Sequence, residues 1–162
     1  MKNKDTSLEK QKKENIKNML DLLIILVTLR NTGEVIEKKS FVCSKDIFML
    51  FHPILSDLPH EEFWILLLNN SSRYMDMQRL SVGGLTGTSA DVRFIMKMAI
   101  ERLSSRIVIC HNHPSGNTTP SRQDMALTRQ IKEGGALLDI TLVDHIIVAD
   151  NEYYSFADEG TL

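Results

Sequence analysis

Between residues 110 and 124 the chain reads CHNHPSGNTTPSRQD, with two histidines one residue apart directly after an apolar run. The run Ile107–Cys110 predicts a buried β-strand. On an extended backbone, residues i and i+2 point to the same side, so His111 and His113 can bind a single ion. The same alternation turns Cys110 away from both histidines, which favours a core position for its sulfur.

Two neutral imidazoles and a carboxylate, with water in the fourth position, form the open zinc site of a hydrolase. The sequence offers a carboxylate at Asp124, after a polar loop bounded by prolines. However, the pattern from Ser121 to Asp124 is also that of a capping box at a helix start. Ser121 can serve both purposes, whereas we expect that Asp124 cannot, because a zinc-bound oxygen is turned inward. The local pattern alone leaves both interpretations of Asp124 open.

A hydrolytic zinc site also needs a base that takes a proton from water. Glu61 and Glu62 precede the apolar run Phe63–Leu68, which predicts a central strand covered on both faces. Either carboxylate is a candidate base, although charged residues at this position are commonly only solvated. Asp144 and His145 are neighbours on another predicted strand and face opposite ways, so we interpret both as structural.

The composition indicates one domain with a substantial core, since the chain has 162 residues. A net charge of -2 gives no overall basic surface for nucleic acid. Two cysteines are too few for a disulfide framework and fit a reducing cytosol. The apolar stretch Met19–Leu29 is too short to cross a membrane and lacks a cleavage site. We therefore expect a cytoplasmic protein without a membrane anchor.

Residues 1–17 carry six lysines against three acidic residues and have almost no apolar content. Such a segment predicts a solvated arm, flexible or helical, with a possible contact to DNA through its lysines. Residues 18–162 are expected to form a single domain.

The remaining patterns predict strands that alternate with about three helices, and hence an α/β (mixed α+β) fold in which helices sandwich a mixed sheet. The helix predicted after residue 88 places six apolar residues on one face, and Gly134-Gly135 are expected to stop the last helix. The predicted strands are Leu22–Leu29, Val35–Val42, Phe63–Leu68, Tyr74–Leu80, Arg106–Cys110, Ile140–Val148 and Tyr153–Phe156. The predicted helices are Ser44–Leu55, with Ser44 as the cap, Ser89–Leu103 and Ser121–Glu133. The apolar face of the second helix comprises Val92, Ile95, Met96, Ala99, Ile100 and Leu103.

The spacing His-x-His-Pro followed by Ser-x-x-Asp, with an upstream glutamate, resembles the JAMM motif of MPN domains. The flanking text is similar more narrowly to the bacterial RadC-type branch of that family. This resemblance covers roughly residues 22–158. The stretches that carry it are Leu80–Leu85, His111–Asn117, Pro120-Ser121 and Leu142–Ile147.

The resemblance implies an MPN/JAMM-like fold, related to cytidine deaminases, in which His111, His113 and Asp124 bind Zn²⁺. It also implies that Ser121 hydrogen-bonds the reacting group and that Glu61, rather than Glu62, is the base. The expected function is zinc-dependent hydrolysis of an amide or isopeptide bond in an unidentified peptide substrate. The alternative is a non-catalytic or nuclease module of DNA repair or recombination on the same fold. Longer RadC-type proteins have a helix-hairpin-helix module where this chain has its lysine-rich arm.

Overall fold

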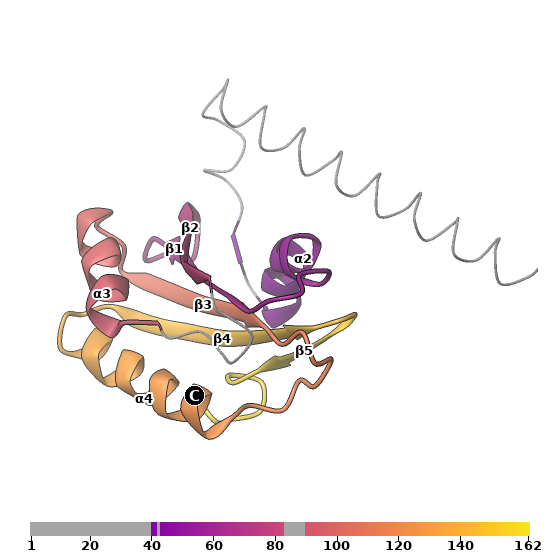
Figure 1. The fold of residues 1–162 in the computed structure, drawn as a ribbon. Helices are drawn as coiled ribbons and strands as arrows, with labels where there is room; N and C mark the ends of the chain where they lie inside the picture. The colour runs from indigo at the N-terminus through magenta and orange to yellow at the C-terminus, as the bar shows by residue number, and fades with distance from the viewer. Residues whose placement is uncertain (1–39, 42, 83–89) are drawn as a thin grey trace, which may run out of the picture. The chain divides into compact units, whose positions relative to one another are not determined.

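The computed structural model describes residues 40–41, 43–82 and 90–162. Within these ranges the chain forms three helices and five strands, so the expected mixed α/β fold is confirmed (Figure 1). In chain order they are α2 (Ser44–Leu55), β1 (Glu62–Leu68), β2 (Tyr74–Val82), α3 (Val92–Glu101), β3 (Arg106–Asn112), α4 (Arg122–Ala136), β4 (Thr141–Ala149) and β5 (Glu152–Ser155). The predicted lysine-rich arm, the predicted strand Leu22–Leu29 and nearly all of the predicted strand Val35–Val42 lie outside the described residues.

The five strands form one sheet in the order β2-β1-β3-β4-β5. Strands β3 and β4 are parallel and are joined through α4, whereas the other neighbouring pairs are antiparallel. In the pairing of β1 with β3, Phe63 lies opposite His111. This register places the start of β1 beside the end of β3, so residues that precede β1 lie near the histidines.

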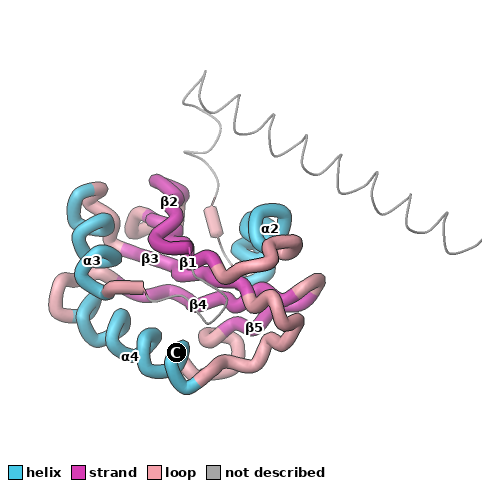
Figure 2. Tube along the Cα trace, in the orientation of Figure 1, coloured by secondary structure: helices cyan, strands magenta, loops and turns pink. Residues whose placement is uncertain are grey.

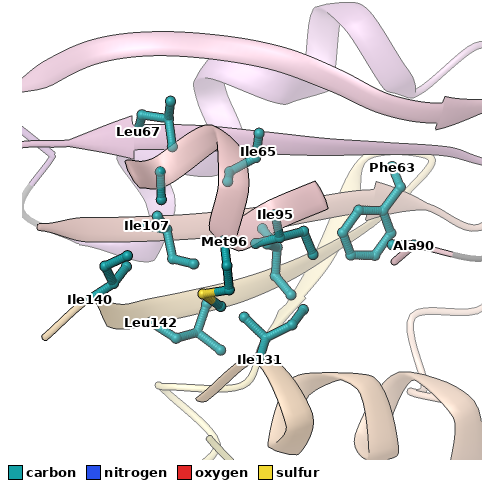
Figure 3. Close-up of a cluster of buried hydrophobic side chains, with 12 residues drawn as sticks. Phe63, Ile65, Leu67, Ala90, Ile95, Met96, Ile107, Ile131, Ile140 and Leu142 are labelled. Carbon is teal, nitrogen blue, oxygen red and sulfur yellow. The ribbon is translucent and has the colours of Figure 1, made fainter. Parts of the chain in front are cut away.

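Helices cover both faces of the sheet, with α2 on one face and α3 and α4 on the other (Figure 2). Alternate residues of β1 serve the two cores: Ile65 packs on the face of α3 and α4 (Figure 3), and Leu66 packs on the face of α2. Both side chains are fully buried. Burial of one such side chain stabilises the folded state by about 1.5–3 kcal/mol. Because both faces of the sheet are covered, every position along β1 and β3 favours an apolar residue, and their sequences are continuous apolar runs.

The apolar face predicted for α3 is only partly buried. Ile95, Met96 and Ala99 lie in the core, but Ile100 is 51% exposed and Leu103 is 86% exposed. The prediction was wrong for Leu103, because the helix ends at Glu101 and Leu103 adopts a positive φ of 52°. Ile100 does lie within the helix, as predicted, but its side chain is not part of the core.

The glycines of α4 do not stop the helix, which continues to Ala136. Gly135 lies against the turn that precedes β4, where a Cβ atom would come within 2.4 Å of the carbonyl oxygen of Ile140. The residue is therefore small because of close packing and not because the helix ends there. The predicted cap of α2 was also wrong by one position, because Cys43 is the N-cap and Ser44 is helical.

Candidate metal centre

Strand β3 carries the first histidine of the motif within its regular pairing. The strand extends to Asn112, two residues beyond the prediction, so His111 is a strand residue that is 97% buried. The backbone N–H of His113 donates to the carbonyl of Val148 at 2.8 Å, so the parallel strand β4 fixes the chain just past the end of β3. Cys110 lies in the core beneath α2, as alternation along the strand predicted.

The first turn of α4 brings a carboxylate to these histidines. The Nε2 atoms of His111 and His113 are 3.0 Å apart. Asp124 places Oδ1 3.3 Å from Nε2 of His111 and Oδ2 3.6 Å from Nε2 of His113. One ligand atom from each residue lies within 4.8 Å of the others, so this group could hold a metal ion.

The hydrogen bonds of His113 show which of its nitrogens faces the group. Its Nδ1 atom lies 2.6 Å from the carbonyl oxygen of Asn117, which can only accept a hydrogen bond. Nδ1 therefore carries a hydrogen, and in the neutral ring Nε2 presents a lone pair toward His111 and Asp124. The converging atoms are rich in electrons and need a cation between them, either a proton or a metal ion.

The pKa values of the metal-free group follow from the same geometry. Burial alone would lower the pKa of His113, but its contacts with Asp124 and the Asn117 carbonyl, together with the charge of Glu61, raise it. Burial alone would raise the pKa of Asp124, but hydrogen bonds from His111 and His113 bring it far below the usual range. The raised pKa of His113 and the lowered pKa of Asp124 both indicate that this cluster favours a positive charge beside the carboxylate.

Asp124 caps α4 and also faces the histidines, so the capping box does not turn its carboxylate away from the site. Its Oδ2 atom accepts from the backbone N–H of Ser121 at 2.7 Å, and the Ser121 hydroxyl accepts from the N–H of Asp124 at 3.1 Å. A carboxylate has two oxygens and about four lone pairs, which leaves Oδ1 directed at His111. The capping box thus orients the carboxylate toward the site.

Glu62 lies in a second polar cluster on the opposite face of β1. Its carboxylate accepts from Trp64 Nε1 at 2.9 Å and from Arg79 at 2.8 Å, and it contacts His60 at 3.3 Å. Burial alone would raise the pKa of Glu62, but these hydrogen bonds outweigh burial and lower it. The geometry therefore gives Glu62 a structural role.

Glu61 directly precedes β1, and strand alternation directs it to the other face from Glu62. Phe63 continues that face and stacks on His111, with ring centroids 5.5 Å apart. The charge of Glu61 is one of the causes that raise the pKa of His113. Glu61 is thus the glutamate on the side of the histidines.

Asn112, between the two histidines in sequence, ties this glutamate's backbone to β3. Its side-chain amide donates to the carbonyl of His60 at 2.9 Å, and its side-chain oxygen accepts from the N–H of Glu62 at 2.8 Å. These two peptide groups flank Glu61, so one buried side chain fixes the glutamate relative to the histidines.

Sequence reasoning did not connect His145 and Thr128 to the site. His145 is fully buried on β4 and contacts Nδ1 of His111, and Thr128 on α4 contacts His145. The only signal in the sequence is a histidine within an apolar strand. That signal does not place His145 near His111 unless the pairing of β4 with β3 is known. Asp144 is structural as predicted, because it accepts hydrogen bonds from Ser155 and two backbone N–H groups.

Comparison with known proteins agrees with the arrangement of sheet, helices and histidines. The RadC-like JAB domain family matches residues 41–161, which is most of the chain. The chain belongs to this family. The resemblance to RadC-type MPN/JAMM domains inferred from the motifs is thereby confirmed, and the mixed sheet with three described helices is consistent with the JAB/MPN fold.

Curated relatives extend the match to bacteria and archaea. A UPF0758 protein from Flavobacterium johnsoniae is 44% identical over 127 residues, which are 78% of this chain and 56% of the relative. A UPF0758 protein from Porphyromonas gingivalis is 46% identical over 130 residues, 80% of this chain and 57% of the relative. A third, from Methanosarcina acetivorans, is 37% identical over 125 residues. This chain spans little more than half the length of the first two relatives.

Among the residues that the structure describes, no helix is both long and apolar enough to cross a bilayer. The apolar stretch Met19–Leu29 lies outside those residues.

Proposed function

We propose that this RadC-like JAB domain is a zinc-dependent hydrolase of amide or isopeptide bonds. The observation that carries the proposal is the convergence of His111 Nε2, His113 Nε2 and the Asp124 carboxylate within 4.8 Å. Two imidazoles and one carboxylate suit zinc and leave one coordination position open, which is the arrangement of catalytic rather than structural zinc sites. A zinc ion held there would lower the pKa of water to about 7 and polarise a carbonyl group.

Glu61 is proposed as the general base. It lies on the face of the sheet that carries the histidines, and Asn112 fixes the peptide groups on both sides of it. Its carboxylate would accept the proton of the attacking water and then deliver that proton to the leaving amine. The position of its backbone relative to the histidines depends on the register between β1 and β3, which pairs Phe63 with His111.

Ser121 is proposed to donate a hydrogen bond to the oxygen on which negative charge develops. Its hydroxyl oxygen accepts from the N–H of Asp124, and the hydroxyl also helps to lower the pKa of the Asp124 carboxyl group. For the proposed role the hydroxyl hydrogen would turn from that carboxylate to the reacting group. The residue is exposed at the N-terminus of α4, where the helix dipole also favours negative charge.

The test is a comparison of amide and DNA substrates. The purified chain is freed of metal by chelation, reloaded with zinc, and assayed on a panel of linear and isopeptide-linked peptides and on single- and double-stranded DNA. We expect hydrolysis of an amide bond that requires zinc and is lost in His113→Ala. Zinc-dependent cleavage of DNA without any amide hydrolysis would contradict the proposal and favour the nuclease alternative.

A further inference from the structure

The second nitrogen of His111 faces a buried chain of hydrogen bonds that none of the proposed roles uses. Nδ1 of His111 lies 2.8 Å from Nε2 of His145, and Nδ1 of His145 lies 2.6 Å from the hydroxyl of Thr128. That hydroxyl in turn donates to the backbone carbonyl of Asp124 at 2.6 Å. The chain therefore runs from one candidate ligand, through β4 and α4, to the backbone of another.

The direction of each hydrogen bond can be fixed from the Thr128 end. The carbonyl oxygen of Asp124 can only accept, so the single hydroxyl hydrogen of Thr128 points to it. The Thr128 oxygen must then accept from His145, which places a hydrogen on Nδ1 of His145. If that hydrogen pointed the other way, two lone-pair-bearing oxygens would face each other at 2.6 Å.

The hydrogen on Nδ1 of His145 also fixes the direction of the hydrogen bond between His145 and His111. A second hydrogen on His145 would place a positive charge on a ring that is fully buried and stacked on Phe156 at 4.5 Å, which is costly. Nε2 of His145 is therefore an acceptor, and Nδ1 of His111 must donate to it at 2.8 Å. With its hydrogen on Nδ1, neutral His111 presents an unprotonated Nε2 to His113 and Asp124.

We infer that Thr128 and His145 are positioning residues that hold His111 in the tautomer able to bind a metal through Nε2. The two ligand histidines are then prepared by different means. For His113 a loop carbonyl accepts from Nδ1, and for His111 a buried histidine and a helix hydroxyl do so. Outer partners of this kind typically change metal affinity by about 10–100-fold.

The inference rests on the proposed metal site, but its first test needs neither metal nor substrate. ¹⁵N NMR of the metal-free chain with labelled histidines, recorded as the pH is raised until the spectra no longer change, reports which nitrogen of each ring carries the hydrogen. We expect His111 and His145 both protonated on Nδ1. A spectrum with His111 protonated on Nε2 would overturn the inference, whether or not the protein hydrolyses amides.

Thr128→Val and Thr128→Ser form the matched pair. Valine keeps the shape but removes the hydroxyl, whereas serine keeps the hydroxyl. We expect a mixture of tautomers at His111 and about 10-fold weaker zinc binding in Thr128→Val, with both properties retained in Thr128→Ser. If both variants lose stability equally and the His111 spectrum stays unchanged in Thr128→Val, Thr128 is only structural and the inference fails. The wild-type spectrum alone remains decisive if Thr128→Val does not fold.

Discussion

Two polar clusters lie on opposite faces of the sheet where β1 begins and β3 ends, and each combines a carboxylate with histidine. In the cluster of Glu62, the carboxylate receives hydrogens from Trp64 and Arg79, so the protein itself satisfies the charge. In the cluster of Asp124, the carboxylate faces Nε2 of His111 and Nε2 of His113, and in the neutral rings both nitrogens present lone pairs. The two clusters therefore differ in how the carboxylate charge is satisfied. Protein donors satisfy it in the Glu62 cluster, whereas the Asp124 cluster needs a cation.

The same difference separates two adjacent glutamates. Alternation along the strand sends Glu62 into the completed cluster and Glu61 to the face of the histidines. A one-residue shift in register would exchange them, and Asn112 opposes such a shift by bonding the peptide groups on both sides of Glu61. Substitutions of Glu61 and Glu62 therefore form a matched pair that tests whether the two clusters have different roles.

The largest expected effect is on turnover. Glu61→Gln removes the proposed base and should lower the rate of zinc-dependent amide hydrolysis by about 10²–10⁴-fold while zinc remains bound. Glu62→Gln, one residue away, should stay within about threefold of the wild-type rate. Rates are measured on one substrate, with zinc content determined for each variant. Equal rates for Glu61→Gln and the wild type would show that Glu61 is not the base.

An effect of intermediate size is expected on stability. Glu62→Ala leaves the donors of Trp64 and Arg79 without their acceptor and should lower the free energy of unfolding by about 2 kcal/mol. Zinc affinity should change by less than about threefold, because the Glu62 cluster lies on the other face. Urea unfolding of the metal-free proteins measures the first quantity, and competition with a chromophoric chelator measures the second. A large loss of zinc affinity would mean that the clusters are coupled.

The smallest expected effect is on how the stability of the metal-free protein depends on pH, and the two clusters should contribute with opposite signs. The folded-state pKa of His113 is raised, so its contribution to stability is full below its unfolded pKa of about 6.5 and is lost as pH rises through the raised value. The folded-state pKa of Glu62 is lowered, so its contribution is full above about 4.5 and is lost as pH falls through the lowered value.

Thermal unfolding from pH 3 to pH 9 checks both signs by comparison of the wild type with His113→Asn and Glu62→Gln. The stability lost by His113→Asn should be larger at pH 6 than at pH 9, and that lost by Glu62→Gln larger at pH 7 than at pH 3. Differences that do not vary with pH would contradict the assigned directions.

The sequence predicted the parts of this molecule that depend on local pattern. The runs in β1 and β3 are apolar because helices cover both faces, so the strands, and the opposite directions of Cys110 and His111, followed from alternation. The end of α3 and the glycines of α4 did not follow. Gly135 is required by the approach of the Ile140 carbonyl as the chain turns from α4 into β4, and the geometry of that turn is not visible in the sequence pattern.

The candidate site also has a part that local sequence predicts and a part that depends on how the strands pair. The spacing of His111 and His113 is visible in one strand, but the pairing of β3 with β4 is needed to bring His145 to His111. The sequence left the role of Asp124 open because it does not show that one carboxylate can accept from the Ser121 N–H through Oδ2 while Oδ1 faces His111.

Titration of the metal-free chain with zinc in a calorimeter measures whether a metal ion completes the cluster of Asp124. We expect one zinc per chain, with an affinity at least about 100-fold weaker in Asp124→Asn and unchanged in Glu62→Gln. A wild-type chain that binds no zinc, or an Asp124→Asn variant that binds zinc as tightly as the wild type, would contradict this expectation.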